Sequence, residues 1–196
     1  IRKIILLKEV DNSSLGKIVK SFQGKHHFDE KFKNIEKERI NILIYNNYFE
    51  LNDKNVKSLT DNYGVEIAVR FIETEGDISL SKIDKLLLED DLIFSLLDTK
   101  NKDLKEHIIN YYFDCVLNNI KQVKISIISK IAKIYINSNL FLDAKQSTIL
   151  RKAELNDSDS IKLLNKIIET LNSEEIKNFL SSMNNFRYNE IAHDTK

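Results

Sequence analysis

The feature that most constrains this chain is a series of short apolar-striped segments that runs from about Ile35 to the C-terminus without a proline. Each segment opens with a cluster of Asp, Asn or Ser, the residue types that cap helix N-termini. Apolar residues at this spacing predict short amphipathic helices. Helices of about 8 to 12 residues are marginal in water, because so short a helix does not recover its nucleation cost. Neighbouring helices must therefore supply the stability.

We expect an all-α fold of stacked short helices, arranged either as an irregular α-solenoid or as a helical bundle. The chain has 196 residues, enough to bury a core without metal or disulfide support. Residues 1–34 are interpreted as an N-terminal apolar segment and a connection, and residues 35–196 as a helical repeat-like domain. Periodicity leaves open whether residues 1–10 form a strand or a helix.

Capping residues and glycines predict where individual helices begin and end. The polar cluster at residues 11–14 precedes a predicted helix over residues 15–22. Asp53 is expected to cap a helix over residues 54–62, which Gly64 ends by turning the chain. Further helices are expected over residues 35–47, 65–75, 92–97, 140–153, 158–171 and 173–183.

Three more helices are expected from other local signals. Asp103 and Glu106 have the spacing of a capping box. A long apolar helix over residues 120–136 is predicted to form the buried spine of the second half of the chain. Ser79 or Ser81 is expected to open another helix, whose apolar stripe consists of Ile83, Leu86 and Leu87.

Composition limits the classes of partner. Thirty basic and thirty acidic residues cancel, so no overall field draws the chain towards nucleic acid or an anionic membrane. No apolar run approaches the roughly 20 residues that a membrane span needs, and no leader is recognisable, so we expect a cytoplasmic protein without a membrane partner. Cys115 is the single cysteine and lies in an apolar run, where we expect a buried thiol.

Most residues that could carry chemistry have a structural interpretation. The four glycines are scattered singly, so no phosphate-binding loop is recognisable, and one cysteine with four dispersed histidines predicts no zinc site. His26 and His27 are expected to be exposed in a loop. The acidic clusters 89–91 and 174–175 are expected to cap helices. We therefore expect neither a metal nor a cofactor in this chain.

One segment has a catalytic interpretation. Residues 186–193, FRYNEIAH, resemble the Arg-x(4–6)-His signature of HEPN ribonucleases. The resemblance implies a metal-independent endoribonuclease that acts as a homodimer, with Arg187 and His193 as catalytic residues. A guanidinium can bind phosphate oxygens in a bidentate manner, and an imidazole can transfer the proton of the attacking ribose hydroxyl. The two residues would lie about 120° apart on an unbroken helix, so Arg187 would have to precede the helix.

A second resemblance covers more of the chain. Residues 39–56, RINILIYNNYFELNDKNV, resemble the helical region of large YobI-type P-loop NTPases, relatives of the STAND ATPases, and residues 66–73 and 91–97 continue the pattern. It implies a non-catalytic scaffold or regulatory segment of a larger intracellular NTPase-like protein. Its partners would be another protein or other domains of the same parent chain, and Ile1 at the first position fits a piece of a longer protein. Nucleic acid is then a partner only under the ribonuclease alternative.

The ribonuclease alternative predicts that the wild-type full-length protein cuts RNA in the presence of EDTA. His193→Ala should abolish cleavage without unfolding the protein, because the imidazole transfers the proton in this mechanism. Cleavage is measured on labelled RNA by gel electrophoresis, and folding by circular dichroism. A dimeric wild-type protein that leaves RNA intact would exclude this function.

Overall fold

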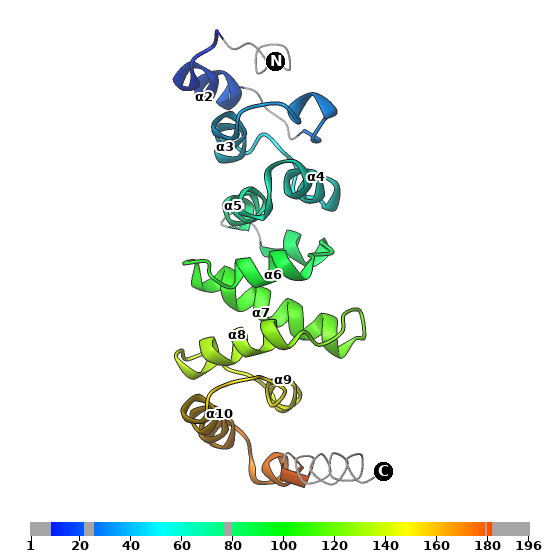
Figure 1. The fold of residues 1–196 in the computed structure, drawn as a ribbon, viewed down its shortest axis with the longest axis vertical. Coiled ribbons are helices and arrows are strands. Elements are labelled where there is room, and N and C mark those ends of the chain that lie inside the picture. Colours follow the sequence, from blue (N-terminus) through cyan, green and yellow to red (C-terminus); the bar gives the residue numbers. More distant parts are fainter. Residues whose placement is uncertain (1–8, 22–25, 77–79, 179, 182–196) are drawn as a thin grey trace. The chain divides into compact units, whose positions relative to one another are not determined.

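The structure is a computed structural model, and its fold is all-α as expected (Figure 1). The structure does not describe every residue. The residues that it describes are 9–21, 26–76, 80–178, 180 and 181. Within these residues the one β-like feature is an isolated parallel bridge between His26 and Phe49. Residues 173–178 are also helical. The named elements are α2 (Asn12–Lys20), η1 (Glu30–Phe32), α3 (Lys37–Tyr45), α4 (Asp53–Tyr63), α5 (Val65–Gly76), η2 (Leu80–Lys85), α6 (Asp90–Leu96), α7 (Lys102–Leu117), α8 (Ile125–Ile136), α9 (Ala144–Leu150) and α10 (Asp157–Thr170), where η marks a 3₁₀ helix.

The chain forms two compact units, Ile1–Tyr112 and Phe113–Lys196, and the division falls within α7. In the first unit α5 packs on α3, α4, α6 and η2, and α2 packs on α3. In the second unit α8 packs on α9 and α10. The expected boundary after residue 34 and the choice between solenoid and bundle stay predictions. None of the described helices is long and apolar enough to cross a lipid bilayer.

Two expected features of the helix ends are confirmed. Asp11 caps α2: its carboxylate accepts the Ser14 hydroxyl at 2.6 Å and the Ser14 N–H at 2.9 Å. These hydrogen bonds, the hydroxyl first, hold the pKa of Asp11 below its usual value. Gly64 ends α4 with a φ of 91°, a conformation that glycine adopts without steric cost.

Other helices begin with an asparagine that lies before the residue indicated by the sequence pattern. Asn52, not Asp53, caps α4, and its side-chain oxygen accepts a backbone N–H at 2.9 Å. Asn101, not Asp103, does the same for α7 at 3.0 Å. A cap needs an extended backbone and a side chain that reaches back to the first turn, whereas an acidic residue inside that turn interacts with the helix dipole. Asn156 and Asn172 cap the later helical segments in the same way.

The predicted spine helix over residues 120–136 is wrong at its N-terminal end. α7 ends at Leu117, and α8 begins only at Ile125. Between them Asn119 has a positive φ of 58°, the left-handed conformation that ends helices, and the N–H of Ile120 donates to Cys115 O at 2.8 Å. Ile120 is 62% exposed, while the Cys115 thiol is buried as predicted.

A fully buried asparagine holds the core of the first unit. The side chain of Asn55, on α4, accepts the N–H of Phe28 at 2.7 Å. It donates to His26 O at 3.1 Å and to Glu50 O at 2.7 Å. These bonds join two loop segments to one helix. They also satisfy backbone groups beside a cluster of packed aromatic rings, Phe28, Phe32, Tyr48, Phe49, Tyr63 and Phe71.

The two neighbouring histidines differ in their surroundings. His27 is exposed as expected. The expectation for His26 is wrong, because its ring lies on Tyr48 with the centroids 4.4 Å apart, and its backbone bonds to Tyr48 O and to the N–H of Glu50. The bridge to Phe49 thus holds the half-buried His26 against the edge of the aromatic cluster.

Tyr63 links α4 to the segment before α3. Its hydroxyl donates to Ile35 O at 3.0 Å and to Phe32 O. Burial raises the pKa of Tyr63, because the phenolate would lose its hydration. The folded pKa then exceeds the unfolded one, so the stabilisation is complete below about pH 10 and is lost as the pH rises through the folded pKa.

A contact between Lys166 and Tyr135 joins α10 to α8 in the second unit. Lys166 of α10 lies over the ring of Tyr135 of α8, with its Nζ 4.7 Å from the ring centroid. The same ammonium group donates to Tyr135 O and Ser138 O at the C-terminal end of α8. A cation at a helix C-terminus interacts favourably with the helix dipole and with the last carbonyl groups. This contact stabilises the packing of α8 on α10.

We expect Asn55→Ala to lower the free energy of unfolding by about 2 to 4 kcal/mol, because the N–H of Phe28 and the carbonyl of Glu50 lose the partner that Asn55 supplies, whereas His26 O still accepts the N–H of Glu50. Urea denaturation followed by circular dichroism measures the effect. Asn62→Ala, which removes only a bond within α4 to Ser58 O, is the matched control and should change stability by less than about 0.5 kcal/mol. Equal effects of the two variants would contradict the role of Asn55.

Candidate functional site

The predicted catalytic pair, Arg187 and His193, lies outside the residues that the structure describes. Their convergence on one phosphate therefore stays a prediction. Across residues 9–21, 26–76, 80–178 and 180–181, no three His, Cys, Asp or Glu side chains gather where they could hold a metal ion. The candidate site comes from the surface of the first unit.

The acidic clusters behave largely as helix starts. Glu175 accepts the N–H of Asn172 at 2.9 Å, and Asn172 accepts the N–H groups of Glu174 and Glu175 at 3.0 Å, so this cluster caps a helix as expected. Asp90 and Asp91 lie in the first turn of α6. Glu89 occupies the N-cap position of α6 but makes no side-chain capping bond, which corrects the expected role of that carboxylate.

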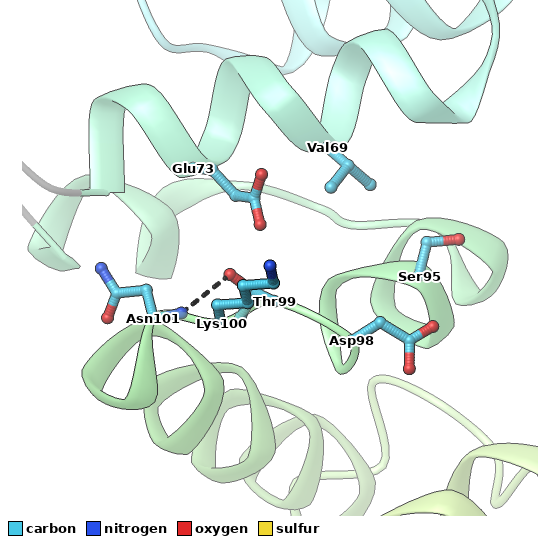
Figure 2. Close-up of a pocket in the computed structure, with 7 residues that line it drawn as sticks. All are labelled: Val69, Glu73, Ser95, Asp98, Thr99, Lys100 and Asn101. Carbon is cyan, nitrogen blue, oxygen red and sulfur yellow. Dashed lines mark hydrogen bonds between the residues drawn. The ribbon is translucent and has the colours of Figure 1, made fainter.

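One hollow of about 470 Å³ lies between α5, the end of α6 and the start of α7 (Figure 2). Val69 and Glu73 of α5 form one side, and the segment from Thr99 to Asn101 lies opposite them. Two of its polar groups serve the start of α7: Thr99 Oγ1 accepts the N–H of Asn101 at 3.3 Å, and Asn101 caps α7.

A second hollow, which we call the Leu87 groove, has a volume of about 290 Å³ and an apolar floor. Val56 and Leu92 are buried, whereas Leu87 is 74% exposed. It is formed by α4, the start of α5, the segment before α6 and the first turn of α6, through Asp53, Val56, Lys57, Thr60, Val65, Leu87, Glu89, Asp91 and Leu92.

Three hydrogen bonds fix the backbone that carries Leu87. The N–H of Leu87 donates to Asp53 Oδ1 at 2.8 Å. The Tyr111 hydroxyl donates to Leu86 O at 2.7 Å and accepts the N–H of Leu88 at 3.2 Å. These bonds hold residues 86–88, which form no regular secondary structure, with Leu86 and Leu88 buried and Leu87 exposed. The backbone of an exposed leucine is thus held in place.

The expected helix with a stripe of Ile83, Leu86 and Leu87 is wrong here. Residues 80–85 form the 3₁₀ helix η2, and residues 86–89 have no regular secondary structure. Burial alternates along the three leucines, which a helix does not produce in consecutive residues, and the middle leucine is exposed. The three consecutive leucines before Glu89 were the available signal, because a run without helical spacing is also compatible with an extended segment.

Charge around the groove is negative. Residues 50–98 contain twelve acidic and five basic side chains, although the whole chain is balanced. Asp53, Glu89 and Asp91 contribute carboxylates to the groove, and Lys57 contributes its one basic group. Lys57 also lies 3.5 Å from Asp61 and 3.8 Å from Glu89, which offsets its charge. Such a concentration of one sign favours cationic ligands.

We expect Tyr111→Phe to lower the free energy of unfolding by about 1 to 2 kcal/mol, since it removes a buried hydroxyl that makes two hydrogen bonds. Hydrogen exchange at the Leu88 amide should accelerate by about tenfold, as local opening becomes easier. Tyr45→Phe, at a side chain that is 62% exposed, is the control and should change neither quantity. An unchanged exchange rate at the Leu88 amide would contradict the role of the Tyr111 hydroxyl in holding residues 86–88.

Comparison of the chain with family models, with characterised proteins and with solved structures found no match. A functional proposal for this chain therefore rests on its own residues and on the two resemblances in its sequence.

Proposed function

We propose that this chain is a non-catalytic helical scaffold or regulatory segment of a larger intracellular NTPase-like protein and that it acts through protein–protein contacts. The observation that carries the proposal is the use of buried polar side chains. Asn55, Tyr63 and Tyr111 each bond to the main chain of a neighbouring segment and hold short elements together. Such residues stabilise a framework, and its surface is left for contact.

The resemblance to the helical region of YobI-type NTPases supports the proposed context. Its residues, 39–56, 66–73 and 91–97, fall on α3 to α6 of the first unit. Many of their apolar positions lie in the core, with Ile40, Leu43 and Phe71 almost fully buried, whereas Tyr45 and Phe94 are exposed. The resembling pattern thus coincides with the residues that pack these helices on one another.

Large apolar side chains on the described surface support a role in contact. Tyr45 is 62% exposed and Leu87 is 74% exposed. Scattered apolar residues are ordinary on protein surfaces, but Leu87 lies at a groove with a fixed backbone. Because its backbone is already held, contact at Leu87 avoids the entropic cost of ordering a loop, which favours its use in a protein contact.

The full-length protein tests this proposal. We expect it to contain a phosphate-binding loop and to bind ATP, measured by equilibrium binding of a fluorescent ATP analogue. Deletion of residues 35–196 should leave nucleotide binding intact and abolish any effect of the protein partner on ATP hydrolysis. His193→Ala is the matched control, and we expect it to change neither property. A full-length protein that binds no nucleotide, or RNA cleavage that depends on His193, would contradict the proposal.

A further inference from the structure

We propose that the Leu87 groove docks a basic amphipathic segment of a protein partner, with an apolar side chain against Leu87 and flanking Lys or Arg side chains at the carboxylates. This inference rests on the proposed function and specifies its contact site and the chemistry of its partner. Three features carry it: a preformed apolar anchor, an acidic rim and the size of the hollow.

The apolar anchor is set before any partner arrives. Leu87 is 74% exposed, yet its N–H donates to Asp53, and the Tyr111 hydroxyl bonds to the backbone of Leu86 and Leu88 on either side. Val56 and Leu92 lie beside it at the floor of the groove. Covering these side chains removes apolar surface from water, and the fixed backbone avoids the entropic cost of ordering a loop.

The acidic rim selects the charge of the partner. Glu89 makes no capping bond, and its carboxylate lies 3.8 Å from Lys57. Asp91 is exposed in the first turn of α6. The side chain of Lys57 is 66% exposed and its Nζ lies 3.5 Å from the Asp61 carboxylate. With Lys57 as the one basic group among Asp53, Glu89 and Asp91, the rim has an excess of carboxylates. Lysine or arginine side chains of a docked segment would reduce the repulsion among them.

The size of the hollow favours a short segment. A volume of about 290 Å³ receives one or a few side chains, which a short segment can present. An amphipathic helix places apolar side chains at i and i+4 on one face and can carry lysines beside them. This mode of recognition combines both features of the groove.

The probe is a fluorescent 16-residue helix-forming peptide with leucines at i and i+4 and flanking lysines, and the control peptide carries glutamates in place of the lysines. Fluorescence anisotropy measures binding to the whole chain. We expect the lysine peptide to bind about tenfold tighter, and its affinity to fall with added salt. Equal binding of the two peptides would overturn the proposal.

Two variants locate the binding. Leu87→Ser should weaken binding of the lysine peptide about fivefold or more, whereas Tyr45→Ser should have no effect. The double variant Glu89→Gln with Asp91→Asn should weaken binding and reduce its salt dependence. Glu106→Gln with Glu169→Gln, two exposed carboxylates outside the groove, is the matched control. Unchanged binding in the Leu87 variant would place the peptide elsewhere and contradict the inference.

A cross-linking experiment separates this inference from the proposed function. Because Cys115 is buried, Leu87→Cys in the full-length protein offers an accessible thiol for maleimide-benzophenone, and Tyr45→Cys serves as control. Cross-links to a basic segment of the partner at position 87 alone support the groove. Cross-links only at position 45, or only to a second copy at position 87, overturn the groove and leave the scaffold proposal intact. Absence of nucleotide binding overturns the scaffold proposal and leaves peptide binding unaffected.

Discussion

The hydrogen bonding of Asn55 is the interaction on which the first unit depends. The segment around Phe28 and the residue Glu50 approach α4 without forming a helix or a sheet, so their backbone groups need partners inside the protein. One fully buried amide supplies three of these bonds. Because the bonds fix where the loops lie, they also fix the aromatic rings of Phe28 and Phe49 against one another. The core of this unit is thus organised by a polar group.

Tyr111 is a second buried polar side chain that holds a non-helical segment, and it thereby positions part of the surface. The hydroxyl of Tyr111 satisfies an acceptor and a donor of the segment before α6, and Asp53 satisfies a third group there. A segment fixed in this way can expose Leu87 without becoming mobile. The bonds that stabilise the framework therefore also position the proposed contact surface, and this links the fold of the first unit to the function that we propose for it.

Local signals predicted some elements well and others poorly. α5 runs from Val65 to Gly76, close to the expected residues 65–75, since its apolar periodicity and the preceding Gly64 are both local. The start of α8 was missed because Asn119 adopts a left-handed conformation that composition does not reveal. Caps were misplaced by one or two residues, because Asn52 and Asp53 are both good capping residues and only backbone geometry decides between them.

The sequence by itself determined the all-α class, most of the helices and the burial of Cys115, because periodicity, caps and glycines act over a few residues. It also contained the two resemblances, including the pair Arg187 and His193, which lies outside the described residues. Only the tertiary structure decided that the half-buried His26 packs on Tyr48, that Asn55 joins two loops to α4, and that Leu87 is exposed beside carboxylates. These outcomes depend on hydrogen bonds between residues more than twenty positions apart, such as Tyr111 with Leu86 and Asp53 with Leu87. No local pattern encodes such pairings, because they form only when the helices pack.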